Sequence, residues 1–319
     1  AHERECAGVI PGACTVNIVG AGLSGLLAAH AWPTARVFEL APGPAAAHRA
    51  LLRFRGDAVS KLTGIEFEPV LVRKGIWFEG NHVAPSIRLA NLYARKVTGV
   101  LAGDRSIWSL EPVQRWVAPE SFYEQMVEAV GARINWGFDA LMGADSIVHE
   151  GSPFISTVPL PLLLKALCLT TATQFNRSPI IVLRYRLPPG TALNQTVYFP
   201  DSWSKIYRAS ITGSLLIVEA VGEDFKPEDA LGEVLKAFGM EGVSVDALDS
   251  VQQRFGKIVP LPAAERKALL GRLTAEHGVF SLGRFATWRN VLLDDVVEDI
   301  AVLRRLMRAS AYERRLFAS

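Results

Sequence analysis

The chain has 319 residues, of which 50% are hydrophobic and 21% charged, a composition typical of an ordered globular protein. Its 34 basic and 32 acidic side chains leave a net charge of +2, which excludes a strong overall field for nucleic acid or membrane surfaces. The length favours two domains, and any anionic ligand has to be met by local groups.

The cysteines and the hydropathy pattern predict a cytoplasmic location. The three cysteines, at positions 6, 14 and 168, lack the CxxC spacing of a metal or redox site, which indicates a reduced protein without a metal centre. The longest apolar stretch, residues 154–169, is interrupted by two prolines and a lysine and is too short for a membrane span. The first residues lack the basic and apolar regions of a signal peptide, so none is expected.

In chain order, the first predicted elements are a strand, a tight turn, a helix and a second strand. Residues 15–19 are β-prone, residues 20–25 are glycine-rich, residues 23–31 favour helix, and residues 35–40 read as a strand. Because a crossover helix separates the two strands, they are expected to be parallel.

The middle of the chain reads as an inserted segment followed by a return to the first sheet. Between residues 64 and 119, short strand-like pieces at 75–78 and 106–110 alternate with Gly, Pro and Asn. A helix is expected at 119–130, and strands are expected at 132–136, 146–148 and 154–158.

The second half predicts an antiparallel sheet and a helical C-terminal part. Strands separated by Pro- and Gly-containing turns are expected at 179–187, 194–199 and 214–220. The remaining expected elements are helices at 227–238, 263–275 and 294–306 and a strand at 278–282.

Residues 18–25 form a dinucleotide-binding fingerprint. Gly20 allows the tight turn, Gly22 lets the backbone approach a pyrophosphate, and Gly25 lets helix pack on strand. Phosphates are expected at the helix N-terminus, where Ser24 can add a hydroxyl contact. Glu39, at the end of the next strand, can accept hydrogen bonds from both ribose hydroxyls and disfavours the 2′-phosphate of NADP. At this point both FAD and NAD fit, and a ligand-free glycine turn is the minor alternative.

Two segments resemble flavoproteins of the amine oxidase and UDP-galactopyranose mutase group. Residues 19–29 resemble the N-terminal fingerprint of that group, and residues 281–290 with 294–296 are similar to its segment of Gly-Arg, aromatic residue, acidic pair and helix. A third, weaker match is 154–159, similar to the strand that leads into the substrate region. The resemblance implies FAD, with Gly283 and Arg284 near its pyrophosphate or isoalloxazine.

The resemblance also implies a fold and a set of cofactor contacts. The expected class is α/β: a Rossmann-type FAD-binding domain of the glutathione-reductase kind with an inserted α+β, largely antiparallel substrate domain. The implied FAD-binding domain comprises 1–63, 119–175 and 265–319, and the substrate domain comprises 64–118 and 176–264. The segment 293–296 is expected to form a helix N-terminus that faces the flavin. The expected cofactor-binding residues are Gly20, Ala21, Gly22, Leu23, Ser24, Gly25, Glu39, Arg49, Gly283, Arg284, Asp294, Asp295 and Val296.

The chain departs from the family pattern after Glu39. Relatives usually have a Gly-Gly-Arg-like turn over the phosphates, whereas this chain has residues 45–49, and Arg49 is the candidate for that role. The chain is also shorter than most relatives, which makes sugar-nucleotide chemistry less expected. The phrases 48–55 and 91–99 resemble bacteriophage flavoproteins, some of which belong to thymidine hypermodification pathways; that branch would work in the host cytoplasm.

Basic and aromatic groups supply further candidates, each with a structural alternative. His48, Arg49, Arg53 and Arg55 alternate with apolar residues and form either a cationic face near an anion or a solvated surface. Two aromatic and basic groups, which can hold a nucleobase and its phosphate but are more often ordinary surface and core, are Arg73, Lys74 and Trp77, and Tyr93, Arg95 and Lys96. The tryptophans at 108, 116, 136, 203 and 288 are expected mostly in the core.

Three functions remain open, in order of preference. The first is an FAD-dependent oxidoreductase that acts on an amine or amino-acid-like group by hydride transfer to flavin N5, and a modified nucleotide or a phage DNA base is a candidate carrier of that group. The second is a mutase-like enzyme in which reduced flavin acts on a sugar nucleotide. The third is a non-catalytic FAD-binding module.

The catalytic residues stay open, with Arg284, Trp288 and Asn290 as candidates. The expected partner is a small-molecule or nucleotide-linked substrate, and no membrane partner is expected. DNA stays open as a partner, although the net charge does not indicate it, and the oligomeric state is open.

Overall fold

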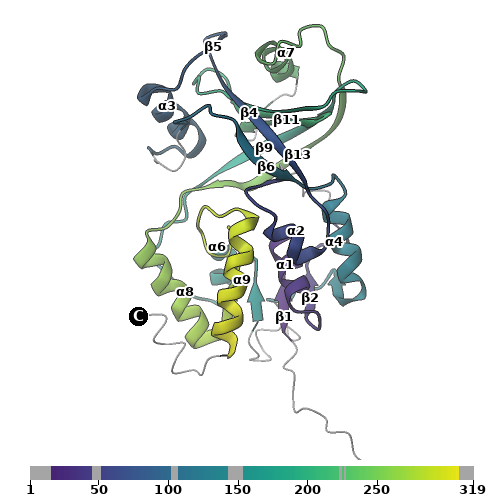
Figure 1. The fold of residues 1–319 in the computed structure, drawn as a ribbon. Helices are drawn as coiled ribbons and strands as arrows, with labels where there is room; N and C mark the ends of the chain where they lie inside the picture. Colours follow the sequence, from purple (N-terminus) through teal and green to yellow (C-terminus); the bar gives the residue numbers. More distant parts are fainter. Residues whose placement is uncertain are drawn as a thin grey trace, which may run out of the picture.

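The computed structural model describes residues 16–44, 52–101, 107–142, 154–222, 225 and 228–308, with the side chains of 228–230 left out. Two sheets, each with its own helices, make up this part of the chain (Figure 1). Sheet A, in the lower half of the view, is parallel, and sheet B, in the upper half, is larger and mixed. The α/β class with an inserted, largely antiparallel sheet is confirmed.

Sheet A has five parallel strands in the order β14-β8-β1-β2-β7. Their bounds are β1 Asn17–Val19, β2 Arg36–Glu39, β7 Ile134–Trp136, β8 Phe154–Ser156 and β14 Val279–Ser281. Asn17 of β1 pairs with Arg36 of β2 on one side and with Phe154 of β8 on the other. The strand order therefore reverses beside β1, and ligands of open parallel sheets bind at such a switch point.

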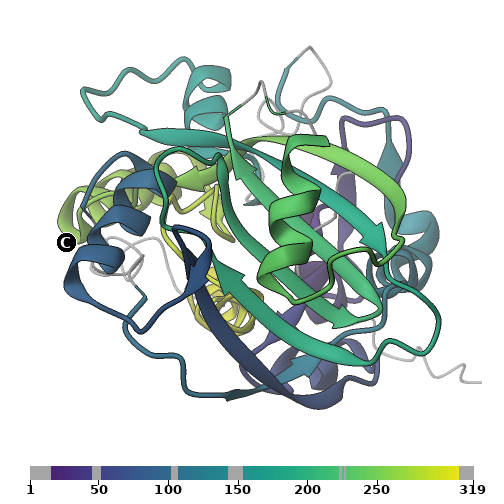
Figure 2. The same cartoon turned by 90° about the horizontal axis from the view of Figure 1, so that it is seen from above.

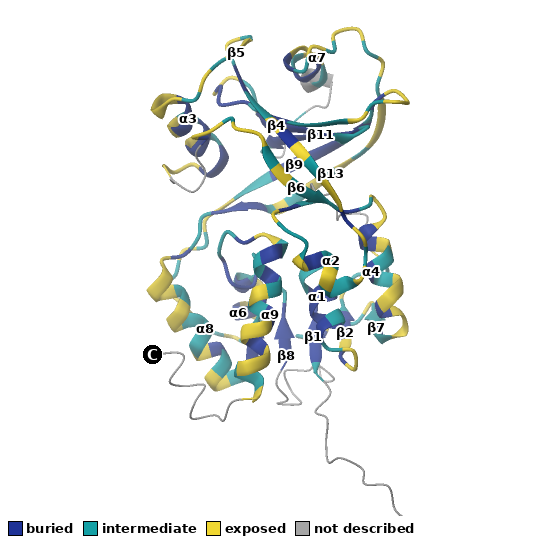
Figure 3. Ribbon diagram, viewed as in Figure 1, coloured by how far each residue is buried: buried dark blue, intermediate teal, exposed yellow. Residues whose placement is uncertain are grey.

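Helices cover sheet A on both sides. Their bounds are α1 Leu23–Ala31, α2 Ala58–Thr63, α4 Phe122–Val130, α6 Leu160–Ala166, α8 Ala263–His277 and α9 Leu293–Arg308, with a 3-10 turn at Gly131–Arg133. Leu26 and Leu27 of α1 are fully buried, because α1 contacts α2, α4 and α9 as well as β1 and β2. The outer faces of α4, α8 and α9 are exposed (Figure 3). In the part of the chain that is described, no helix combines the length and the apolarity needed to span a bilayer.

Sheet B has nine strands, in the order β13-β9-β12-β11-β10-β4-β6-β3, with β5 paired to β4. Their bounds are β3 Arg53–Phe54, β4 Glu68–Phe78, β5 Asn81–His82, β6 Val113–Val117, β9 Arg177–Arg186, β10 Leu193–Tyr198, β11 Ile206–Gly213, β12 Leu215–Val221 and β13 Asp246–Ile258. The pairing of β10 with β4 is parallel, and all other pairs in this sheet are antiparallel.

Two helices pack against sheet B on opposite faces. Helix α7, Glu228–Ala237, lies across the strands in the view from above (Figure 2), and its Val234 packs in one apolar cluster with Ile211 and Val218. Helix α3, Ile87–Thr98, contributes Leu89 and Val97 to the cluster on the other face. That second face also carries the polar side chains described below.

Several predicted elements differ from the structure. No strand forms at 107–110, where Ile107 and Leu110 pack in the apolar cluster beside α3. The strand nearest to this segment is β6, which begins three residues later, at Val113. Helices α2, α3 and α6 and strands β3, β5, β6, β11 and β13 were not predicted. The expected strand at 146–148 lies outside the described residues. Trp108 and Trp203 are 57% and 66% exposed, so the expectation of a core position was wrong for these two.

The predicted domain boundaries stay a proposal. All five strands of sheet A come from the three ranges assigned to the nucleotide-binding domain. Strand β3, from the first of those ranges, is built into the edge of sheet B.

Candidate functional site

The glycine fingerprint forms the turn between β1 and α1. Gly20 has φ +101°, and a Cβ atom there would lie 2.2 Å from Thr157 Oγ1. At Gly25 a Cβ atom would lie 1.9 Å from the carbonyl oxygen of Gly20. Neither approach is possible for a residue with a side chain, because both are far shorter than van der Waals contact. The two glycines therefore hold α1 directly against the turn, as their spacing predicts.

The first turn of α1 presents backbone N–H groups beside this turn. Gly22 is the N-cap residue, and no side chain caps the helix or places an acidic group in its first turn. The N-terminal N–H groups of a helix have no intrahelical partners and carry the positive end of the helix dipole. Gly22, Leu23 and Ser24 thus offer the anion-binding geometry that the fingerprint predicts.

Glu39 lies at the end of β2, next to the same turn. Its carboxylate accepts hydrogen bonds from the backbone N–H of Ala21 at 2.7 Å and of Ala41 at 3.0 Å. These bonds fix the carboxylate between the two strand ends. Each carboxylate oxygen keeps a lone pair for a ligand hydroxyl.

A cavity of about 610 Å³ opens beside Glu39 and the glycine turn. Its walls combine the turn at 20–22, aromatic residues Phe38, Trp136 and Phe138, and the α6 residues Leu162 and Lys165. The volume falls within the range of small-molecule sites, and the lining is mostly apolar with few polar groups, as in such sites. We call this the fingerprint cavity.

The segment after β14 packs against the start of α1. Gly283 has φ +89°, and a Cβ atom there would lie 2.4 Å from Ser24 Oγ. The Arg284 guanidinium donates to the carbonyl oxygen of Val291 at 3.0 Å, which ties the loop to the start of α9. Residues more than 250 positions apart along the sequence thus meet at the predicted phosphate site.

The first turn of α9 carries the predicted acidic pair. Asp294 is 9% exposed; its Oδ1 accepts from the N–H groups of Arg55 and Gly56, both at 3.1 Å, while its buried Oδ2 has no hydrogen-bond partner. Asp295 accepts from the Leu292 N–H at 2.7 Å and from the Arg55 side chain. Arg55 therefore pairs with the protein's own carboxylate. Val296 is buried in the core beneath this turn.

The remaining predicted residues divide into three cases. Arg49 lies outside the described residues. Trp288 is fully buried, with φ +47° and its ring edge-on to Phe175 and Phe255, which is a core environment. Asn290 is half-buried in the loop before α9. Catalytic roles for Arg284, Trp288 and Asn290 remain predictions.

Arg53 on β3 turns away from the nucleotide turn and points across sheet B. It donates to Thr196 Oγ1 at 2.8 Å, to the carbonyl of Gln195 at 3.2 Å and to the carbonyl of Ile211. Because β3 is three strands away from β10, this contact requires the sheet to curl. Burial, together with the nearby charge of Arg208, lowers the pKa of Arg53 to about 10.

A buried ionic cluster, absent from the sequence predictions, lies on the same face of sheet B. Glu219 on β12 accepts from Tyr207 Oη at 2.7 Å and pairs with Arg208. Lys257 Nζ lies 3.9 Å from the Glu219 carboxylate. Burial acts to raise the pKa of Glu219, but Arg208 and Lys257 outweigh it and lower the pKa to about 2. The sequence signal was a single carboxylate within the apolar strand 215–221, since a buried charge needs a partner.

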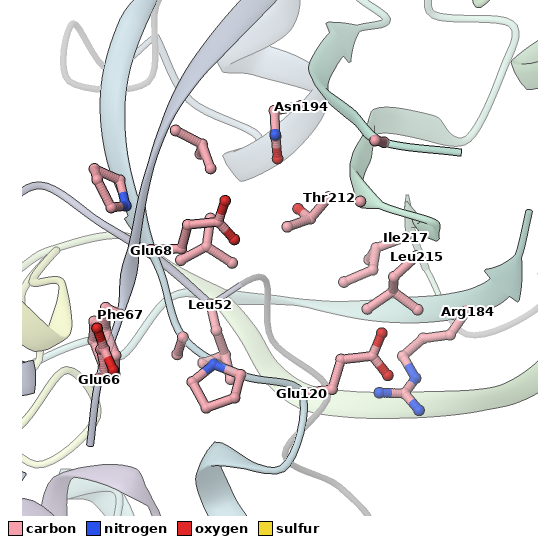
Figure 4. Close-up of a pocket in the computed structure, with 17 residues that line it drawn as sticks. Leu52, Glu66, Phe67, Glu68, Glu120, Arg184, Asn194, Thr212, Leu215 and Ile217 are labelled. Atoms are coloured by element: carbon pink, nitrogen blue, oxygen red, sulfur yellow. The ribbon is translucent and has the colours of Figure 1, made fainter. Parts of the chain in front are cut away.

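A second cavity of about 650 Å³ lies between sheet B and the start of α4 (Figure 4). Figure 4 shows Asn194, Thr212 and the Glu68 carboxylate around its interior, with Glu120 and Arg184 at one side. Asn194 and Thr212 are paired across β10 and β11, and Asn194 Oδ1 and Thr212 Oγ1 are both buried without a hydrogen-bond partner. No sequence pattern predicts this pair. We call this the sheet B cavity.

The two aromatic and basic groups do not converge on either cavity. Trp77 and Tyr93 are buried in separate apolar clusters. Lys96 donates to the carbonyls of Phe199 and Ile206, and burial lowers its pKa to about 8. These contacts match the structural alternative for both groups. No group of three or more His, Cys, Asp or Glu residues suited to a metal is present in the described ranges, and Cys168 is a free, exposed thiol.

The sequence matches no protein-family model and no curated protein. Solved structures do match. A structure of reduced UDP-galactopyranose mutase aligns over 92% of this chain and 93% of its own, at 15% identity and a TM-score of 0.61. An oxidoreductase from Methanosarcina mazei aligns over 91% and 100%, at 11% identity and 0.53. A ternary complex of aklavinone-11 hydroxylase with FAD and aklavinone aligns over 92% and 62%, at 11% identity and 0.51. At these identities the likeness establishes the fold: this chain has the two-sheet architecture of these enzymes over almost its whole described length.

Proposed function

We propose that the chain is an FAD-dependent oxidoreductase that acts on an amine or amino-acid-like group. The observation that carries the cofactor assignment is the meeting of three segments beside the first turn of α1: the glycine turn, Glu39 and the loop that begins at Gly283. The hydroxylase with the same fold is described as a complex with FAD, which supports this choice over NAD.

The residues present fit an FAD molecule. The open N–H groups at the start of α1 suit a pyrophosphate, and Glu39 suits the adenosine ribose. The orphaned, buried Oδ2 of Asp294 is an acceptor that a ribityl hydroxyl would satisfy, and a buried acceptor without a partner is costly otherwise. When bound, FAD supplies a two-electron acceptor for the hydride that leaves the carbon next to an amine nitrogen.

The choice of an amine rests on the charge of the sheet B cavity. Among the described residues that line it, Glu66, Glu68 and Glu120 are acidic and Arg184 alone is basic. Glu120 is held by Arg186, and Arg184 is held by Asp249. Glu66 and Glu68 therefore give this cavity a negative character that suits a protonated amine. The narrower substrate, an amine on a modified nucleotide or phage DNA base, rests on the sequence resemblance alone.

The test is spectroscopic. The purified protein should show flavin absorbance, and the released cofactor should run as FAD on chromatography. Under anaerobic conditions, amine or aminoacyl compounds should bleach the flavin band. A colourless protein that binds NAD would overturn the cofactor assignment; an FAD protein that no amine reduces would overturn the reaction.

A mutase-like reaction is the second candidate, favoured by the TM-score of 0.61 with UDP-galactopyranose mutase. In that case a sugar nucleotide would be turned over only after the flavin had been reduced by dithionite, and without net oxidation. Activity of the oxidised protein on an amine distinguishes the two functions.

Glu39→Gln should weaken FAD binding about 30-fold. The neutral amide loses charge-assisted hydrogen bonds to the ribose, worth about 2 kcal/mol. Equilibrium dialysis of the apoprotein with FAD measures the change. Glu128→Gln, an exposed position on α4, is the matched control and should bind FAD like the parent. Equal affinity in both variants would contradict a ribose contact at Glu39.

A further inference from the structure

The sheet B cavity contains two hydrogen-bonding atoms that the protein itself leaves unsatisfied. Asn194 and Thr212 are paired across β10 and β11, and Asn194 Oδ1 and Thr212 Oγ1 are buried and have no protein partner. The pair two residues further along the same strands, Thr196 and Ser210, is satisfied: the two hydroxyls are 3.0 Å apart, and Thr196 also accepts from Arg53. The orphaned pair is thus a local exception on this sheet face.

An exception of this kind has a physical cost. A buried polar group without a partner destabilises a protein, so such groups are usually paired unless a ligand or water completes them. Here the two atoms border a cavity of about 650 Å³, large enough for a small organic ligand. A ligand that hydrogen-bonds to them would remove the cost.

The charge around the pair selects the kind of ligand. Glu68 extends from β4 toward the interior of the cavity, on the side of Thr212 and Asn194 (Figure 4). No ion pair to Glu68 is present among the described residues, whereas Glu120 and Arg184 are already engaged. A group with several N–H donors and a positive charge matches one carboxylate and two oxygen acceptors.

The location is also suited to a substrate. The start of α4 borders both cavities, since Glu120 lines the sheet B cavity and Tyr123, three residues later, lines the fingerprint cavity. Tyr123 donates to the Ala21 carbonyl at 3.3 Å, which ties α4 to the glycine turn. A ligand in the sheet B cavity would therefore lie in the region where the two sheets meet.

We propose that the sheet B cavity is the binding site for the protonated primary amine of the substrate, with Glu68 as its counter-ion and Asn194 and Thr212 as its hydrogen-bond acceptors. The inference rests on the proposed function in one respect: the bound amine is a substrate only if the protein oxidises it. The binding itself is independent of flavin chemistry.

The experiment measures ligand affinity by saturation-transfer NMR on the FAD-loaded full chain. The probes are n-propylamine, n-propanol and propionate, which differ in charge but little in size. The amine should bind, the alcohol should bind about fivefold more weakly, and propionate should not bind. Glu68→Gln should weaken amine binding about fivefold, the effect of losing a charge pair with an exposed carboxylate, and should leave the alcohol unchanged.

Thr212→Val separates ligand binding from structural support. Replacing an unsatisfied hydroxyl by a methyl group should raise the melting temperature of the ligand-free protein by about 2 °C and weaken amine binding about fivefold. Thr98→Val is the matched control, because the Thr98 hydroxyl donates to the Ala94 carbonyl at 2.9 Å. That variant should melt no higher than the parent and bind the amine equally well.

The outcomes distinguish this inference from the proposed function. Amine binding that depends on Glu68 and Thr212 supports the site even if no amine ever reduces the flavin. Equal binding of all three probes, or amine binding unchanged in both variants, would overturn it. If the two substitutions lowered FAD retention and left amine affinity unchanged, the cavity would hold part of the flavin, and the inference would be wrong.

Discussion

Gly25→Ala is expected to abolish FAD retention and to destabilise the chain by about 3 kcal/mol, at the upper end of the usual cost of overpacking. The added Cβ atom would lie 1.9 Å from the Gly20 carbonyl oxygen, a backbone atom that no rotamer change can move aside. Helix α1 would have to shift away from the turn, and its N–H groups would move with it. Flavin absorbance after gel filtration and urea unfolding measure the two effects.

Gly43→Ala is the control for that substitution. A Cβ atom at Gly43 meets nothing within 4 Å, and its backbone has no positive φ, so both flavin content and stability should match the parent. Normal FAD content in Gly25→Ala would show that the turn and helix are not in close contact.

Glu219→Gln is expected to lower the free energy of unfolding by about 3–5 kcal/mol, the cost of leaving buried charges without their partner. Arg208 and Lys257 would then face a neutral amide on a buried sheet face. Urea denaturation at neutral pH measures the loss. Glu120→Gln removes an exposed pair with Arg186 and should cost less than about 1 kcal/mol. A similar small loss for both variants would contradict the buried ionic cluster.

The same carboxylate gives the wild-type protein an acid-dependent stability. The pKa of Glu219 is lowered in the folded state from 4.5 to about 2, so its ionised form is favoured by folding. The contribution, about 3 kcal/mol, is complete above pH 4.5 and is lost as the pH falls from about 4.5 toward 2. Unfolding free energy measured between pH 6 and pH 3 should therefore fall less steeply in Glu219→Gln than in the wild type.

Most of sheet A could be predicted from the sequence, whereas sheet B could be predicted only in part. Strands β1 and β2 have short apolar runs joined by a recognisable turn. Strand β13 is an edge strand whose first half is largely exposed, so it lacks the apolar alternation that marks a strand. In β11 a bulge at Tyr207 interrupts the alternation and places Tyr207 and Arg208 both against Glu219. Local pattern cannot indicate that irregularity.

The candidate site shows the same division. The fingerprint and the Gly283 segment were recognisable because each has a fixed backbone requirement, and the structure brings them together at Ser24. The different contacts of Arg53 and Arg55 could not be predicted, because both residues lie in one run of alternating basic and apolar residues. Arg55 pairs with Asp295 of α9, and Arg53 reaches β10 and β11. Because sheet B is curved, Arg53 reaches across it and Arg55 does not.

The order of strands in sheet A also bears on how the protein folds. Strand β8 is flanked by β1 and by β14, yet β1 begins at Asn17 and β14 only at Val279, with strands β9 to β13 of sheet B between β8 and β14. Such pairing gives a high contact order, for which loop-closure entropy slows folding. During synthesis, one edge of β8 would stay unpaired until β14 has emerged from the ribosome. We therefore expect slow, chaperone-sensitive folding, with the nucleotide site completed last.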